Sequence, residues 1–269
     1  MDNKYIAVFD SGLGRLTAVK ELMKVLPDEN IIYFGDTGRV PYGSRSDSTI
    51  IKYVRSDVNF LRSFDIKLII VACGTASTVA LPHIQNEVDI PMLGVLLPTV
   101  NAAVKATKNK KIGVLGTSGT IGSGKYEEEI KKINPDIFVY NKACPMFVPL
   151  VENGFIDDEV AYIVCKKYLD GVLSEGVDTI ILGCTHYPLL EKTIAKIAGP
   201  EITLINAGAE TANYTKKYLT ENDMLSSEKM DVQYRYYVSD SIDNFAGVAD
   251  KFLGKPIENS IEQIDIEKY

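Results

Sequence analysis

The sequence predicts an α/β protein made of two similar lobes with mostly parallel sheets and an active-site cleft between them. Short apolar runs such as YIAVFD and KLIIVAC alternate with longer amphipathic segments such as LTAVKELMKVLP along most of the chain. Continuous apolar strands that alternate with helices are typical of a parallel sheet covered on both faces. A weak internal repeat then divides the pattern into two halves.

The same alternation predicts the individual elements in order. Apolar runs predict strands, and segments with apolar residues at helical spacing predict helices. We expect strands at 5–10, 30–36, 67–73, 91–96, 111–117, 136–141 and 178–184, and helices at 16–27, 48–64, 74 to about 88, 125–133, 159–176 and 188–199. The tail after Lys255 is polar, and we expect it to be loosely held.

The internal repeat places two cysteines at equivalent positions. IAVF leads into DSGLG, and about a hundred residues later IGVL leads into GTSGT. At nearly the same offset, LIIVA leads into CGTAST with Cys73, and IILG leads into CTHYP with Cys184. Ligands of open α/β sheets bind beyond the carboxyl ends of the strands. If the lobes face each other, each contributes one cysteine to a shared cleft.

Composition excludes several kinds of function. The 269 residues are 46% hydrophobic and 24% charged, as in an ordinary globular protein of one large or two modest domains. The net charge of −7 and the pI near 5.0 argue against nucleic acid or an anionic membrane as the main partner. We see no signal peptide and no apolar run near the roughly 20 residues that span a bilayer. We therefore expect a cytoplasmic protein with reduced thiols.

Two facing thiols suit the inversion of a carbon stereocentre by proton transfer. The reaction needs a base on one face of the carbon and an acid on the other, and a thiolate with a thiol can supply both. Because the pKa of a free cysteine is about 8.5, each thiol needs a neighbour that shifts its pKa or receives its proton. Asp10, Glu152 and His186 are the candidate helpers. A single cysteine at a strand end can equally be a small buried hydrophobe, but two at matching positions favour a pair.

Two glycine-rich segments match nucleotide-binding motifs only in part. GTIGSGKY at 119–126 has the spacing of a phosphate loop, but Tyr126 stands where Ser or Thr would bind magnesium. We expect instead a loop that holds a substrate carboxylate and runs into a helix beginning near Ser123. GLG at 12–14 would need a third glycine at position 17 to make a dinucleotide fingerprint, and Thr17 is there.

Other readings of the cysteines and histidines are also open. Cys73, Cys184 and His186 could ligate zinc, but the sequence lacks a second tight ligand pair. A Cys184–His186 nucleophile for acyl transfer leaves Cys73 unexplained. We expect His83 on an exposed helix face without a role. The remaining candidates are expected to be structural: Cys144, Cys165 within an amphipathic helix, and the charged run EEEIKK at 127–132 as a solvated face.

The sequence resembles the glutamate racemases of the cofactor-independent aspartate/glutamate racemase superfamily along nearly the whole chain. YFGDTGRVPYG at 33–43 together with GCTHYPLL at 183–190 makes the resemblance specific. The other matching stretches are FDSGLG at 9–14 and VACGTAS at 71–77, with weaker matches in PLVENG at 149–154 and FLG at 252–254.

The resemblance implies that L- and D-glutamate are interconverted without pyridoxal phosphate or metal, supplying D-glutamate for peptidoglycan. It implies that Cys73 takes the proton from the D-isomer and Cys184 from the L-isomer. Asp10 would assist Cys73, and Glu152 and His186 would assist Cys184. Hydroxyls and N–H groups at helix N-termini suit the carboxylates of such a substrate. The implied substrate-binding residues are Asp10, Ser11, Pro41, Tyr42, Gly43, Gly74, Thr75, Thr117, Thr120, Thr185 and His186.

The resemblance also implies a layout in which the C-terminal segment returns to the first lobe. We therefore predict a first lobe of residues 1–98 plus about 207–269, which carries Asp10 and Cys73. Residues 99–206 would form the second lobe, with Glu152, Cys184 and His186. The expected partner is a small-molecule substrate, glutamate. A homodimer stays open, and neither nucleic acid nor a membrane is expected.

Four positions depart from the pattern that the resemblance implies. Gly74 stands where Asn usually follows the first catalytic cysteine, and Leu97 stands in a loop that usually carries an acidic residue. Arg15 replaces a common glycine, and Asn206 replaces a frequent Asp. Because Gly74 has no side chain to hold substrate, a racemase of aspartate or another amino acid is an alternative. A non-catalytic amino-acid-binding protein is another, although both cysteines and all three helpers are present.

Overall fold

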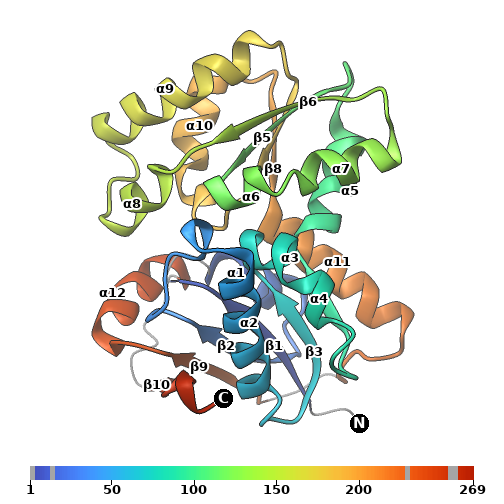
Figure 1. The fold of residues 1–269 in the computed structure, drawn as a ribbon, viewed down its shortest axis with the longest axis vertical. Helices are drawn as coiled ribbons and strands as arrows, with labels where there is room; N and C mark the ends of the chain where they lie inside the picture. Colours follow the sequence, from blue (N-terminus) through green and yellow to red (C-terminus); the bar gives the residue numbers. More distant parts are fainter. Residues whose placement is uncertain (1–3, 13–15, 228–230, 254–259) are drawn as a thin grey trace.

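Two separate parallel sheets, each flanked by helices, form the protein (Figure 1). The structure is a computed structural model that describes residues 4–12, 16–227, 231–253 and 260–269. Leu13, Gly14 and Arg15 of the first matching stretch, and Gly254 of the FLG match, lie outside the described residues. Every strand pair within the described ranges is parallel, so the predicted α/β class is confirmed.

The first sheet has six strands in the order β10-β9-β2-β1-β3-β4. Its strands are β1 (Tyr5–Asp10), β2 (Asn30–Gly35), β3 (Ile66–Val71), β4 (Met92–Gly94), β9 (Tyr234–Val238) and β10 (Ile261–Gln263). Its helices are α1 (Leu16–Val25), α2 (Asp47–Leu61), α3 (Gly74–Val79), α4 (Leu81–Ile84) and α12 (Ile242–Leu253), with the 3₁₀ turns η2 (Tyr42–Ser44) and η5 (Ile266–Lys268).

The second sheet has four strands in the order β6-β5-β7-β8. Its strands are β5 (Lys111–Gly116), β6 (Phe138–Ala143), β7 (Thr179–Leu182) and β8 (Thr203–Asn206). The accompanying helices are α5 (Leu96–Ala106), α6 (Ser118–Gly122), α7 (Lys125–Ile133), α8 (Phe147–Glu152), α9 (Glu159–Ser174), α10 (Glu191–Ala198) and α11 (Ala207–Glu221), with the 3₁₀ turn η3 (Tyr187–Leu190).

The internal repeat seen in the sequence is a repeat of topology. The order β2-β1-β3-β4 in the first sheet corresponds strand for strand to β6-β5-β7-β8 in the second. In the first sheet, Phe9 of β1 pairs with Val71 of β3, and in the second, Leu115 of β5 pairs with Leu182 of β7. Each predicted catalytic cysteine lies two residues beyond the paired residue of its strand. The two thiols therefore occupy equivalent turns.

The predicted lobe boundaries fall at the two connections between the sheets. The chain crosses through α5 and returns through α11, and these two helices pack against each other. Asn206 begins α11 by accepting the N–H groups of Gly208 and Ala209 at 3.0 and 3.3 Å. Asparagine caps a helix as well as aspartate does, which accounts for that departure. Leu97 lies exposed on α5. The boundaries themselves stay a prediction.

The expectation of a loosely held tail after Lys255 is wrong for the residues from Ile261 onward. Ile261–Gln263 pairs with β9 as an edge strand of the first sheet, and the Ile266 side chain is buried. The Tyr269 ring packs edge-on against Phe60, with 5.2 Å between ring centroids. The apolar residues of this segment are spaced among charged ones, so the tail reads as polar although its inward side chains are not.

A buried ion pair ties the segment after α11 to the first sheet. Lys67 of β3 contacts Glu29 with 2.7 Å between Nζ and Oε2, and both side chains are almost fully buried. The Ser226 N–H and hydroxyl donate to Glu29 at 2.7 and 2.9 Å, and Lys67 donates to the Met224 carbonyl at 2.6 Å. These bonds compensate for the cost of removing both charges from water. No helix in the described ranges has the length and apolar character to cross a membrane.

Replacing Lys67 by methionine should lower the free energy of unfolding by about 3–5 kcal/mol, because the Glu29 carboxylate would stay buried without its cation. Urea unfolding measures the change. Lys110→Met is the matched control, since its pair with Asp136 is exposed and should contribute less than about 1 kcal/mol. Equal effects of the two substitutions would contradict this account of the buried pair.

Candidate active site

A cavity of about 290 Å³ lies between the two sheets, and every segment that lines it follows the carboxyl end of a strand. Residues after β1, β2 and β3 form one wall, and residues after β5, β6 and β7 form the other. This is where parallel α/β sheets bind ligands. The lining residues are Ser11, Gly12, Val40, Pro41, Tyr42, Gly43, Ser44, Thr75, Thr117, Ser118, Pro145, Val148, Pro149, Glu152 and His186.

The residues predicted for the site divide into a lining group and a buried group. Those that line the cavity are Ser11, Pro41, Tyr42, Gly43, Thr75, Thr117, Glu152 and His186. Those that lie buried behind the wall are Asp10, Cys73, Gly74, Thr120, Cys184 and Thr185. Sequence reasoning missed Ser44 and Ser118, although each adjoins a predicted residue. Cys73 is 0% exposed and Cys184 is 3% exposed, so both thiols are enclosed.

Strand pairing brings the polar groups around Cys73 together. Because Phe9 pairs with Val71, the turn after β1 lies beside the turn after β3. Ser11 Oγ is 3.3 Å from Cys73 Sγ, and the Ser11 N–H donates to Asp10 Oδ1 at 2.5 Å. Cys73 is the N-cap of α3, and its sulfur accepts the Ala76 N–H at 3.2 Å. An N–H donor aimed at sulfur stabilises negative charge that forms there.

Cys184 is the first of three interacting groups, followed by His186 and Glu152. Its Sγ lies 3.7 Å from Nδ1 of His186, and Nε2 of His186 lies 3.3 Å from Oε1 of Glu152. The carboxylate favours a proton on Nε2, which leaves Nδ1 to face the sulfur as a proton acceptor. Glu152 ends α8 with its side chain 34% exposed, so this chain leads from an enclosed thiol to the rim of the cavity.

The other two cysteines differ in their surroundings. Burial raises the pKa of the Cys165 thiol to about 12, and burial raises the pKa of Cys144 still further from its ordinary value. Both side chains pack in the hydrophobic core, Cys165 on α9 as expected. Thiols with such a pKa stay protonated near neutral pH and cannot serve as bases there.

Three threonine hydroxyls link the two walls of the cavity. Thr75 Oγ1, after β3, lies 3.2 Å from Thr117 Oγ1 and 3.4 Å from Thr120 Oγ1, both after β5. Thr117 is also the N-cap of α6, where its hydroxyl accepts the Thr120 N–H at 3.2 Å. The sequence predicted a loop here and a helix from about Ser123. The segment instead folds as the short helix α6, and α7 begins at Lys125.

The described residues contain no cluster of metal ligands, and the second histidine does not line the cavity. Within the described ranges, no three His, Cys, Asp or Glu side chains converge as metal ligands, so Cys73, Cys184 and His186 do not make a zinc site. His83 is exposed on α4, as expected. The acidic run at 127–132 lies on α7 and pairs with its own lysines, for example Glu127 with Lys131 at 3.1 Å.

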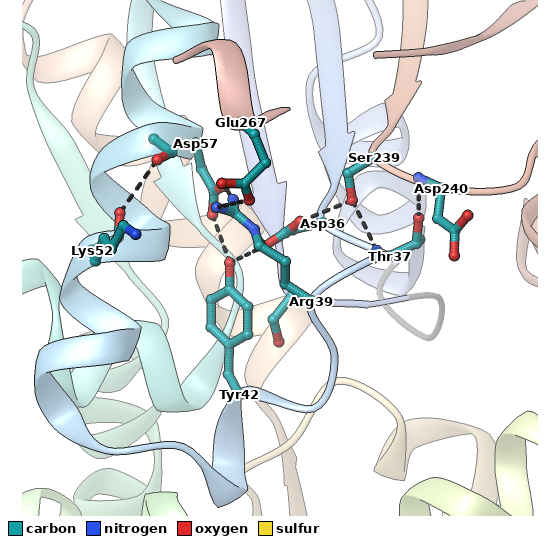
Figure 2. A network of polar contacts seen from close by, with 12 residues as sticks. Asp36, Thr37, Arg39, Tyr42, Lys52, Asp57, Ser239, Asp240 and Glu267 are labelled. Atoms are coloured by element: carbon teal, nitrogen blue, oxygen red, sulfur yellow. Dashed lines mark hydrogen bonds and ion pairs between the residues drawn. The ribbon is translucent and has the colours of Figure 1, made fainter. Parts of the chain in front are cut away.

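A buried polar network holds the wall formed by Val40–Ser44 (Figure 2). The Arg39 guanidinium contacts Asp36 at 2.7 Å and Asp57 of α2 at 2.5 Å. The Tyr42 hydroxyl donates to Asp36 and lies 2.9 Å from Asp57 Oδ2. Ser239, just after β9, donates to Asp36 at 2.8 Å.

Burial and the charges of both aspartates raise the pKa of Tyr42, so its hydroxyl stays protonated as a donor. Burial and the Asp36 charge raise the pKa of Asp57 as well. Tyr42 was predicted to bind substrate. Its hydroxyl bonds the two aspartates and the residue lines the cavity, so binding of substrate by Tyr42 stays a prediction.

The family profile, the related sequences and the related structures agree on the kind of protein that this chain resembles. The sequence profile of the Asp/Glu/hydantoin racemase family matches residues 18–215. A glutamate racemase of Geobacter metallireducens is 44% identical over 264 residues, which cover 98% of this chain and 97% of that protein. The structure of a Bacillus anthracis glutamate racemase matches with a TM-score of 0.94 and 38% identity over 97% of both chains. That of a Francisella tularensis glutamate racemase, in complex with D-glutamate, matches with a TM-score of 0.92 and 37% identity over 100% of both.

Tyr42→Phe should lower the free energy of unfolding by about 1–3 kcal/mol, because two buried carboxylates lose the hydroxyl between them. Tyr53→Phe is the control, because that ring packs on Arg39 and Tyr42, whereas the bonds to Asp36 and Asp57 come from Arg39, Tyr42 and Ser239. We expect the control to stay within about 0.5 kcal/mol of the parent in urea unfolding. A Tyr42→Phe protein as stable as the parent would show that the hydroxyl does not stabilise this wall.

Proposed function

The chain belongs to the Asp/Glu/hydantoin racemase family, and on this premise we propose that it is a glutamate racemase whose Cys73 and Cys184 carry the Cα proton. The observation that carries the proposal is the equivalence of the two thiols. They lie on matching turns of two sheets that share the order of four strands, and polar neighbours of each thiol line one cavity. The full-length glutamate racemase relatives favour glutamate as the substrate.

The reaction needs only the two thiols and their neighbours. In the L-to-D direction, the Cys184 thiolate takes the Cα proton, and the Cys73 thiol donates its own proton to the opposite face of the carbanion. The enzyme is then left with a Cys73 thiolate and a Cys184 thiol, which is the form that acts on the D-isomer. Atoms and charge balance without an added co-reactant, and we propose that none is used.

The helper groups have separate parts in this scheme. His186 accepts the proton of Cys184 through Nδ1, and Glu152 stabilises the imidazolium that results. On the other side, the Ala76 N–H supports the Cys73 thiolate, and Asp10 and Ser11 complete its surroundings. We propose that the substrate lies among the predicted residues of the facing turns, and that hydroxyl and N–H groups of these turns hold its carboxylates: Ser11, Pro41, Tyr42, Gly43, Gly74, Thr75, Thr117, Thr120 and Thr185.

The remaining parts of the proposal concern the setting of the enzyme. D-glutamate made by the reaction would supply peptidoglycan synthesis in the cytoplasm. The proposed binding partner is glutamate, and neither nucleic acid nor a membrane is proposed as a partner. Whether two copies of the chain form a homodimer stays open. We also keep the predicted lobes, residues 1–98 with about 207–269 and residues 99–206.

Proton exchange tests the proposal directly. With L-glutamate in D₂O, chelator present and no pyridoxal phosphate, NMR should show deuterium at Cα together with D-glutamate. Cys73→Ala and Cys184→Ala should each lower the racemisation rate by about 100-fold or more, because each removes a proton carrier. Cys165→Ala is the control and should keep the parent rate.

Three outcomes would contradict the proposal. Folded Cys73→Ala and Cys184→Ala proteins with the parent rate would exclude the two-thiol mechanism. Exchange with aspartate or another amino acid, but not with glutamate, would identify a different racemase. No exchange with any amino acid would favour a non-catalytic binding protein.

His186→Asn should lower kcat/KM by about 100-fold. The loss must be equal in both directions, because enantiomers have equal free energy and their equilibrium constant is one. The isotope effect need not be equal. If His186 serves Cys184, the effect of Cα deuterium should rise for L-glutamate and fall for D-glutamate. His83→Asn, on the exposed face of α4, is the control. Equal isotope effects for both isomers would exclude a role of His186 on the Cys184 side.

A further inference from the structure

Two side-chain hydroxyls behind the cavity bind backbone carbonyls of turns that carry proposed site residues. The Thr17 hydroxyl of α1 donates to the Thr185 carbonyl at 3.2 Å, in the turn after β7. The Tyr33 hydroxyl of β2 donates to the Gly12 carbonyl at 3.1 Å, in the turn after β1. Neither Thr17 nor Tyr33 lines the cavity, and no sequence pattern assigned a role to either hydroxyl.

The Thr17 bond joins a helix of the first sheet to the turn that carries Cys184. The Thr185 carbonyl and the His186 N–H belong to one planar peptide unit, so a bond to this carbonyl helps to fix the direction in which His186 leaves the backbone. The preceding carbonyl, of Cys184, instead accepts the Tyr187 N–H within the turn at 3.0 Å. Thr17 therefore restrains this turn from the opposite sheet.

Packing of α1 keeps the Thr17 hydroxyl in place. The residues on either side of it, Leu16 and Ala18, are buried, and α1 packs against α11. The distance of 3.7 Å between Cys184 Sγ and His186 Nδ1 is long for a hydrogen bond, and such bonds weaken steeply with misalignment. A small rotation of the imidazole would therefore interrupt proton transfer to it.

The Tyr33 bond has the corresponding place on the other side of the site. The Tyr33 ring is fully buried and stacks on Phe245 of α12, with 5.7 Å between ring centroids. Gly12, whose carbonyl it binds, directly follows Ser11. Because Ser11 Oγ lies 3.3 Å from Cys73 Sγ, a shift of this turn would move the hydroxyl that faces the thiol.

We propose that Thr17 and Tyr33 are positioning residues for proton transfer, each serving one of the two thiols. Thr17 orients His186 beside one thiol, and Tyr33 orients Ser11 beside the other. Both act through a backbone carbonyl, as supporting groups behind an active site commonly act through the groups that they hold. The inference deepens the proposed function and rests on it for the roles of the thiols.

Removal of each hydroxyl tests its own side of the site. Thr17→Val and Tyr33→Phe keep the shape of the side chain and lose the bond. Each should lower kcat/KM by about tenfold, equally in both directions, because a small misplacement far from the chemistry is enough to lower the rate. Thr17→Ser retains the hydroxyl and should restore most of the rate.

The isotope effect of Cα deuterium separates positioning from general damage. Thr17→Val should raise the effect for L-glutamate and lower it for D-glutamate, because it slows the step at Cys184. Tyr33→Phe should do the reverse, because it slows the step at Cys73. A structural defect slows both steps alike, so a loss of rate with unchanged isotope effects would overturn the proposal.

Two matched variants are the controls. Thr193 donates to the Ile156 carbonyl at 3.2 Å, the same kind of bond at the same length, and neither residue lines the cavity. Tyr236 lies beside Tyr33, with 6.5 Å between ring centroids, and its buried hydroxyl has no partner among the described residues. Thr193→Val and Tyr236→Phe should keep the wild-type rates and isotope effects.

Alkylation by iodoacetamide tests the same positioning without substrate, because the reagent reacts with the thiolate. Mass spectrometry follows each cysteine separately. Thr17→Val should slow the reaction of Cys184 about fivefold and leave Cys73 unchanged, because a displaced imidazole accepts the proton less well. Tyr33→Phe should slow Cys73 alone by a similar factor, because a displaced Ser11 hydroxyl stabilises the thiolate less.

Unselective changes in alkylation would contradict the proposal. Faster reaction of both cysteines in either variant would indicate a loosened fold, and unchanged rates at both would show that the two bonds position nothing. Alkylation needs no turnover, so these outcomes hold whether or not the wild type exchanges the Cα proton of glutamate. Absence of that exchange would contradict only the proposed function.

Discussion

Parallel pairing of the central strands is the constraint from which the site follows. When β1 pairs with β3 and β5 with β7, the turns after these strands must gather at one edge of each sheet. Each turn leads into a helix, so its N–H groups and short hydroxyl side chains face the same space. Four strands have the same order in both sheets, and each sheet therefore brings one thiol to its edge. A single sheet could provide only one side of such a site.

The buried network around Arg39 gives this arrangement a rigid wall. Two carboxylates, a guanidinium and a phenol meet where water is scarce, and such charges are tolerated only when each is paired. Arg39 supplies two pairs, and Ser239 contributes from a distant part of the chain. The wall is thus held by α2, by the strand end of β2 and by residues near the C-terminus together. Glu267 extends the same set at 3.6 Å from Arg39.

Much of this could be predicted from the sequence because it depends on local patterns. Apolar runs predicted β1 to β7 but not β8, β9 or β10, and the repeated loops predicted that Cys73 and Cys184 are equivalent. The contribution of Asp57 could not be found, because a charged residue in an amphipathic helix looks like a surface residue until its distant partners are known. The contact of Thr75 with Thr117 depends on how the two sheets face each other, which no local pattern encodes. The tail was misjudged because three well-placed isoleucines among charged residues leave little hydrophobic signal.

The position of β9 has a consequence for the order in which the protein can assemble during synthesis. β9 is the neighbour of β2 in the first sheet, although some two hundred residues separate them in the chain. While the ribosome makes the intervening residues, β2 has an open edge with unpaired N–H and carbonyl groups, and such edges invite pairing with other chains. All four strands of the second sheet are complete before β9 emerges. The half of the enzyme that starts first is therefore finished last, and its nascent form is the stage at which a chaperone would protect it most.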